Sequence, residues 1–95
     1  MIRIRGELVC ADAAESDAVD HHLPEHAERT RAEPGCLAFE VVPTADPLVW
    51  RVDELFRDDD AVGAHRERMD GSAWARATAG IERRYAQVVT EAETG

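Results

Sequence analysis

The first ten residues alternate between apolar and charged side chains, the period of two expected of a strand whose faces differ. We therefore predict a strand over residues 2–10. From residue 13 to residue 32 the apolar positions recur at steps of three and four, which predicts an amphipathic helix. Glu33-Pro34-Gly35 ends that helix, because proline keeps the preceding residue out of the helical region and glycine allows a reversal.

Two further strands, joined by a turn, follow this helix. Residues 36–43 and 48–56 are rich in β-forming side chains, and residues 44–47 (Thr-Ala-Asp-Pro) supply the turn between them. Asp58 caps a second helix that ends at Gly71, and Ser72 caps a short further helix. A strand pattern returns at Tyr85, and residues 91–95 form a loose tail. The order βαββαβ predicts an α+β fold, a two-layer sandwich of ferredoxin-like type.

Both faces of the second and third predicted strands carry apolar residues; in the second strand Leu37, Phe39 and Val41 share the face opposite to Cys36, Ala38 and Val42. We therefore expect both faces of the sheet to be buried. Arg51 and Asp53 fall on the opposite face of the sheet, where we expect them to meet Arg3, Arg5 or Glu40 in charge pairs at the interface between two subunits. A chain this short also has little apolar area left to enclose a ligand alone. We therefore predict a homodimer whose two sheets pack face to face.

The composition limits the kinds of partner that we expect the protein to bind. Ninety-five residues with 44% hydrophobic content form a single domain, 1–95, and the net charge of −9 argues against nucleic acid and membrane partners. We find no leader-like start and no apolar run that could span a bilayer, so we expect a cytoplasmic protein. Cys10 and Cys36 are predicted to be buried free thiols.

Few aromatic residues are available, and most could line one cavity. The five are Phe39, Trp50, Phe56, Trp74 and Tyr85. His65 falls on the apolar face of the second helix, which would aim it inward, and its ordinary pKa of about 6.5 suits a general base. The alternative is that His65 is a packed histidine with one hydrogen bond, and that Trp50 and Trp74 belong to the core.

Four groups of residues carry a further signal: residues 30–40 (Thr-Arg-Ala-Glu-Pro-Gly-Cys-Leu-Ala-Phe-Glu), Trp50 with residues 53–56 (Asp-Glu-Leu-Phe), Ala61 with Ala64-His65, and Ser72 with Trp74. In this order they resemble the antibiotic-biosynthesis monooxygenase family of dimeric α/β-barrel proteins, which also contains quinol monooxygenases. The resemblance covers nearly the whole chain.

This resemblance implies a reaction that needs no metal, flavin or other cofactor. A phenol or anthrone is deprotonated, and its anion passes an electron directly to O2. The site would consist of His65 as base and of Trp50, Trp74, Phe39, Tyr85 and Glu54 around a small aromatic substrate. The chain has no Asn, and residues 74–81 contain no His, which argues against the haem-degrading branch. The missing Asn also argues against the anthrone-oxygenase branch, leaving a quinol-type or uncharacterised branch.

Two groups of residues each allow more than one interpretation. Glu54 shares a strand face with Trp50, Val52 and Phe56, so its carboxylate needs a partner; we favour an ion pair with an arginine over catalysis. His22 and His26 stand four apart beside His21, the spacing of metal ligands. No third ligand has matching spacing, so we predict no metal site and interpret the histidines as a solvated helix face.

We therefore predict a cofactor-independent monooxygenase of a phenolic, quinol-like or polyketide aromatic substrate, a function connected with antibiotic biosynthesis. Two alternatives are a non-catalytic aromatic-binding or accessory protein, and an isomerase or cyclase that works without oxygen.

Overall fold

The computed structural model describes residues 1–89; the loose tail predicted for residues 91–95 lies outside the described residues. Its elements follow in the order β1 (Ile2–Val9), α1 (Ala13–Arg31), β2 (Cys36–Pro43), β3 (Val49–Phe56), α2 (Asp59–Met69), α3 (Ala73–Ala77) and β4 (Glu82–Val89). This order confirms the predicted βαββαβ arrangement, with two helices in its second helical part.

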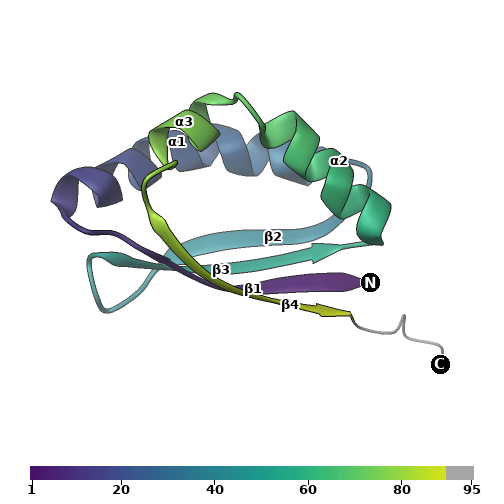
Figure 1. The fold of residues 1–95 in the computed structure, drawn as a ribbon, viewed down its shortest axis with the longest axis horizontal. Coiled ribbons are helices and arrows are strands. Elements are labelled where there is room, and N and C mark those ends of the chain that lie inside the picture. Colours follow the sequence, from purple (N-terminus) through teal and green to yellow (C-terminus); the bar gives the residue numbers. More distant parts are fainter. Residues whose placement is uncertain (90–95) are drawn as a thin grey trace.

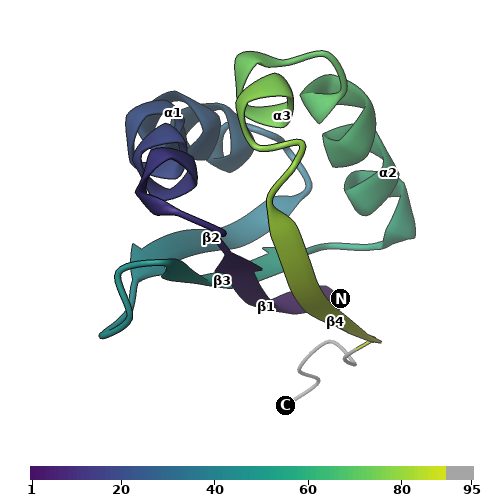
Figure 2. The ribbon, with the colours of Figure 1, turned by 60° about the vertical axis from the view of Figure 1, so that its left-hand side comes forward.

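The four strands form one antiparallel sheet in the order β2-β3-β1-β4. All three helices lie over the same face of that sheet (Figures 1 and 2). The fold is therefore the predicted ferredoxin-like α+β sandwich. No helix in the described part of the chain is long and apolar enough to cross a membrane.

Each helix begins at a polar side chain that binds an otherwise unpaired backbone N–H group. Asp12, Asp58 and Ser72 accept from the backbone nitrogen three residues further on, at 3.0, 2.8 and 3.1 Å. Such caps satisfy the donors that the first turn of a helix leaves free. Asp58 and Ser72 were predicted as caps from the sequence, and both are confirmed.

Alternation along β3 sets which side chains face the helices. Trp50, Val52, Glu54 and Phe56 are buried on the inner face, as their spacing predicts. On the outer face Asp53 contacts Arg3 at 3.0 Å and Arg5 at 3.4 Å.

On the same outer face, Arg51 Nη2 lies 3.6 Å from Glu40 Oε1. The charge pairs expected there thus form within one chain.

One residue breaks the predicted alternation in β2. The pairing with β3 shifts between Cys36 and Ala38, which places Leu37 at a β-bulge. Leu37 is 50% exposed, so the prediction that it shares the inner face with Phe39 and Val41 was wrong. The extra residue in the bulge reverses the direction of every side chain before it.

Strand β4 begins at Glu82, three residues before the predicted start, and pairs with β1. Gly6 of β1 lies opposite Tyr85 and allows β4 to approach closely, since a Cβ atom there would lie 2.0 Å from the carbonyl oxygen of Arg84. Gly6 therefore helps to position β4 beside β1. In Figure 2 the chain runs from α3 directly down into β4.

The core has two parts beneath the helices. The larger contains Leu8, Cys10, Val19, Ala27, Phe39, Val41, Trp50, Val52, Trp74 and Ile81. The smaller contains Ile2, Ile4, Phe56, Ala61 and Val62. Cys10 and Cys36 are free thiols, as predicted, but only Cys10 is buried, whereas Cys36 is partly exposed; loss of contact with water raises the pKa of both.

Candidate functional site

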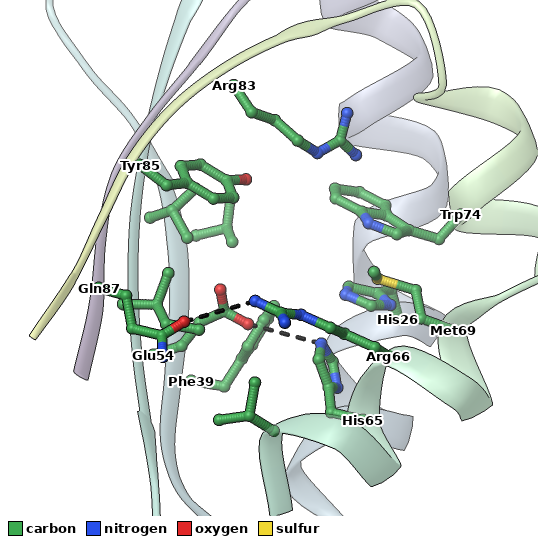
Figure 3. A pocket seen from close by; sticks show the side chains of 14 residues that line it. His26, Phe39, Glu54, His65, Arg66, Met69, Trp74, Arg83, Tyr85 and Gln87 are labelled. Carbon is green, nitrogen blue, oxygen red and sulfur yellow. Dashed lines mark hydrogen bonds and ion pairs between the residues drawn. The ribbon is translucent and has the colours of Figure 1, made fainter. Parts of the chain in front are cut away.

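A cavity of about 280 Å³ lies between the inner face of the sheet and the helices (Figure 3). All four strands and all three helices contribute to its lining: Ile4, His26, Phe39, Val41, Val52, Glu54, Val62, His65, Arg66, Met69, Trp74, Arg83, Tyr85 and Gln87. Apolar walls with a few polar groups are typical of small-molecule sites. Five of the six predicted site residues line this cavity: His65, Glu54, Trp74, Phe39 and Tyr85.

His65 enters the cavity from α2, where Ala61 and Val62 share its buried face. Behind it, His65 Nδ1 lies 2.9 and 3.1 Å from the two carboxylate oxygens of Glu33. Because a carboxylate can only accept hydrogen bonds, this contact places the hydrogen on Nδ1. A neutral His65 therefore presents an unprotonated Nε2 on its other edge.

Glu33 is itself held in place by an arginine. Arg68 Nε donates to Glu33 Oε2, and Arg68 Nη2 donates to Thr30 Oγ1 at 3.0 Å. Thr30 is fully buried in α1, and Arg68 belongs to α2. The end of α1 thus anchors the cavity-lining histidine of α2.

Glu54 faces the other edge of the imidazole. Its Oε1 lies 3.6 Å from His65 Nε2, and its side chain is only 9% exposed. That distance is too long for a hydrogen bond, so the two atoms remain available to a third group. The dashed line between these residues in Figure 3 crosses the inner part of the cavity.

The expected ion pair between Glu54 and an arginine is absent among residues 1–89, where the one basic side chain within 4.0 Å of the Glu54 carboxyl group is His65. Burial, together with the charge of Glu33, raises the pKa of Glu54 to about 7, against the lowering effect of Arg66 and Arg83. At neutral pH the carboxyl group is therefore close to half protonated.

Burial also lowers the pKa of His65, and this effect outweighs the opposing attraction of Glu33. The imidazole is consequently neutral near pH 7, with Nε2 able to accept a proton. His65 and Glu54 together form an acid–base pair on one wall of the cavity. This pair titrates as a unit, since each group alters the charge near the other.

Aromatic rings form an adjacent wall. Trp74 is 6% exposed, and His26 stacks on it with ring centroids 4.5 Å apart and planes 3° from parallel. Phe39 meets the His26 ring edge-on at 5.4 Å. These rings give a flat substrate a surface on which to pack.

The prediction that the α1 histidines form a solvated helix face was wrong for His26, which is 4% exposed and turned inward. Burial lowers its pKa to about 3, assisted by the nearby charges of His65 and Arg68. Its Nδ1 has no hydrogen-bond partner in the described part of the chain. His26 is therefore a neutral ring at ordinary pH.

No cluster of three or more metal-binding side chains occurs among residues 1–89.

Trp50 does not line the cavity, so its predicted position was wrong. It is buried on the expected face of β3, but it pairs with Leu8 and lies roughly 13 Å along the strand from Glu54. There it packs beneath α1, and its Nε1 donates to Ser16 Oγ at 3.1 Å. The period of two identified the face correctly, but it says nothing about which helix covers each end of the strand.

Tyr85 reaches the cavity from β4. The residue is 40% exposed, and partial loss of contact with water raises the pKa of its hydroxyl to about 12, so the hydroxyl remains protonated and able to donate a hydrogen bond.

Sequence reasoning missed several residues of the site: Glu33, His26, Arg66, Arg68, Met69, Arg83 and Gln87. Glu33 was interpreted as part of the helix stop and of the segment that carries the family resemblance, but not as a residue of the site. For His26 a signal existed, since it lies seven residues after Val19 and four before Thr30, both of them buried positions of α1. The remaining residues depend on how α2 and β4 meet.

Comparison with known proteins adds a family assignment to this geometry. A family model described as "Antibiotic biosynthesis monooxygenase" matches residues 1–77. No curated protein matches the chain.

Several solved structures are similar to the chain in fold. "Putative antibiotic biosynthesis monooxygenase from Nitrosomonas europaea" has 18% sequence identity and a TM-score of 0.80, with 95% of this chain and 98% of that chain covered. A protein of the same description from Deinococcus radiodurans has 18% identity and a TM-score of 0.81, over 100% and 97% of the two chains. Rv0793 from Mycobacterium tuberculosis has 17% identity and a TM-score of 0.76, over 99% and 98%.

Proposed function

The chain belongs to the antibiotic biosynthesis monooxygenase family, and we propose that it is a cofactor-independent monooxygenase that oxidises a small phenolic or quinol-like substrate with O2. The observation that carries this proposal is the placement of His65, with Glu33 behind it and Glu54 in front, beside the wall formed by Trp74 and Phe39. We extend the family's domain to the whole chain, 1–95.

The acid–base pair suits the first step of such a reaction. A phenol packed against Trp74 and pointing at His65 Nε2 or Glu54 Oε1 would lose its proton to the pair. Glu33 favours this transfer because its negative charge stabilises the imidazolium that forms. Tyr85 supplies a hydroxyl donor from the facing strand for the developing oxyanion.

The electrons for oxygen reduction come from the substrate. The phenolate anion passes one electron to O2, and the phenoxyl and superoxide radicals combine to form a C–O bond. The acid–base pair returns the phenol proton to the resulting peroxide anion, giving a hydroperoxide at a ring carbon. Loss of the remaining C–H proton breaks the O–O bond, so that the ring carbon becomes a carbonyl and the second oxygen leaves as water. The sum is phenol plus O2 to quinone plus water, and no external reductant is needed.

The cavity volume limits the substrate. Drug-sized ligands occupy pockets of about 300–1,000 Å³. A cavity of about 280 Å³ fits one or two fused rings better than a polycyclic skeleton.

We further propose that two copies associate through the outer faces of their sheets. The helices cover the opposite face of each sheet, as Figure 1 shows. On the outer face Val42, Val49 and Leu55 are only half-buried within one chain, between the charge pairs of Asp53 and Arg51. Sedimentation equilibrium tests this association; a monomer at micromolar concentration would refute it.

Oxygen consumption tests the oxygenase function. The purified chain is assayed with 1,4-dihydroxynaphthalene, 2-naphthol and anthrone, against a blank for spontaneous oxidation. His65→Gln should lower the protein-dependent rate by roughly 10²- to 10⁴-fold, the range for loss of a general base. His21→Gln is the matched control on α1, since His21 is exposed and does not line the cavity.

The pH profile gives a second readout. Because deprotonation of the acid–base pair is required, the rate should rise with pH through about 7. Equal oxygen uptake by the wild-type chain and His65→Gln on every substrate would refute the oxygenase function. Product formed under anaerobic conditions would instead support an isomerase or cyclase, and aromatic binding without turnover an accessory protein.

A further inference from the structure

Two arginines that line the cavity have no carboxylate partner. Among residues 1–89, seven arginines lie within 4.0 Å of an acidic side chain: Arg3, Arg5, Arg29, Arg51, Arg57, Arg68 and Arg84. The other four are Arg31, Arg66, Arg76 and Arg83, of which Arg66 and Arg83 line the cavity. In a chain with twenty acidic residues, this leaves local positive charge beside the site.

Arg83 is held rigidly in place. Its Nη1 donates to the carbonyl oxygens of Thr78 at 2.8 Å and Ile81 at 3.1 Å, and its Nη2 donates to Thr78 Oγ1 at 2.8 Å. A guanidinium group has five N–H donors; Tyr85 is a further hydrogen-bond partner of Arg83, so one donor remains unused. Its charge also acts inside the cavity, because it helps to lower the pKa of both Glu54 and His26.

Arg66 approaches from α2, on the opposite side. The one hydrogen bond that its side chain makes in the described part of the chain is a long one of 3.4 Å to Gln87 of β4. Figure 3 shows its side chain extending across the cavity toward β4, with Arg83 and Tyr85 further along the same opening. The guanidinium is therefore free to make stronger bonds to a ligand.

We propose that the substrate carries an anionic group, a carboxylate, that binds to Arg66 and Arg83, while its phenol end points to His65 and Glu54. Carboxylates pair with guanidinium groups through short, charge-assisted hydrogen bonds, which are the strongest polar contacts that the cavity offers. Neither arginine forms an ion pair with Glu54 in the described part of the chain, although the charges of both lower the pKa of Glu54 from a greater distance. The position of the phenol end rests on the proposed function; the position of the carboxylate does not.

The test compares two probes that differ only in the anionic group. 6-Hydroxy-2-naphthoate carries a phenol at one end of its ring system and a carboxylate at the other, and 2-naphthol lacks the carboxylate. Their dissociation constants are measured under anaerobic conditions by the change in naphthol fluorescence. The wild-type chain should bind 6-hydroxy-2-naphthoate at least about 10-fold more tightly, the effect expected of one charge-assisted hydrogen bond.

The variants Arg66→Gln and Arg83→Gln should each remove most of this preference and leave the binding of 2-naphthol within about 2-fold. Arg76→Gln is the matched control, because Arg76 also has no carboxylate partner among residues 1–89 and does not line the cavity. If Arg83→Gln fails to fold, Arg66→Gln still decides the question, since Arg66 is exposed and its loss leaves the core intact.

Equal affinity for both probes, no measurable binding of either probe, or an equal loss of both in the arginine variants would overturn the proposal. The oxygenase function has a separate test. Intact preference for the carboxylate without oxygen uptake would refute only the reaction, and oxygen uptake without that preference would refute only the anionic substrate.

Discussion

Glu54 provides a sharp test of the site because its buried environment raises the pKa of its carboxyl group. It lies on the inner face of β3 with 9% of its side chain exposed, and in the described part of the chain no arginine is close enough to form an ion pair with it. Replacing it by glutamine keeps the shape of the side chain and removes the charge. Glu54→Gln should therefore change the dependence of stability on pH.

The magnitude follows from the pKa. The ordinary pKa of 4.5 applies to the unfolded chain, and the folded value is about 7. Between these values the folded chain holds a proton that the unfolded chain has lost, so the free energy of unfolding falls as pH rises through the folded pKa. At about 1.4 kcal/mol per pKa unit, roughly 2–3 kcal/mol is lost between pH 5 and pH 8.5.

Glutamine resembles the protonated form at every pH. Relative to the wild-type chain, Glu54→Gln should become more stable by roughly 2–3 kcal/mol on going from pH 5 to pH 8.5. For a domain of this size the gain corresponds to an increase in Tm of about 10 °C or more. Urea unfolding at the two pH values, followed by circular dichroism, measures the difference directly.

Glu40→Gln is the matched control, because Glu40 is an exposed carboxylate on the outer face of the same sheet. Its effect on stability should change by less than about 0.5 kcal/mol over the same pH range. A stability difference for Glu54→Gln that does not depend on pH would show that Glu54 is ionised throughout. The acid–base pair proposed for the cavity would then lack its protonated member.

Other positions give further predictions. The free energy of unfolding of His26→Phe, relative to that of the wild-type chain, should rise by roughly 3 kcal/mol between neutral pH and pH 4. The reason is that the folded chain holds the pKa of His26 at about 3, so the wild-type chain loses stability as the pH falls below 6.5. Acid titration followed by circular dichroism measures this difference. Gly6→Ala should lower the free energy of unfolding by about 1–3 kcal/mol or more, because its Cβ atom clashes with the β4 backbone. Gly63→Ala, in open space on α2, should raise the free energy of unfolding by about 0.5–1 kcal/mol. Urea midpoints that shift in the same direction in both variants would contradict this. Trp74→Leu should weaken binding of 2-naphthol at least several-fold, and Trp50→Leu should lower stability without changing affinity per folded chain; fluorescence titration distinguishes them.

The two carboxylates around His65 show how environment assigns different roles to one residue type. Glu33 has Arg68 beside it and contacts the Nδ1 edge of the ring. Glu54 has only the neutral imidazole within ion-pair range among residues 1–89, and its pKa rises to about 7. One carboxylate contacts and orients the histidine, and in the proposed function the other exchanges a proton beside it.

Local pattern in the sequence was enough to predict the order of elements and most of their bounds. Alternation and helical spacing depend only on the period of each element, and capping residues such as Asp58 act on the next few residues along the chain. For this reason β2 was predicted at its observed bounds, and Glu54 was placed on the correct face of β3. Leu37 was misplaced because a bulge leaves no mark in the period of two.

The site depended on both kinds of information. The sequence by itself determined that His65 and Trp74 face inward, because each lies on the buried face of its own helix. Only the tertiary structure decided that Glu33 binds His65 and that Trp50 lies away from the cavity. Contacts of this kind join residues more than thirty positions apart, and their geometry is fixed by how helices and strands pack, which no local pattern records.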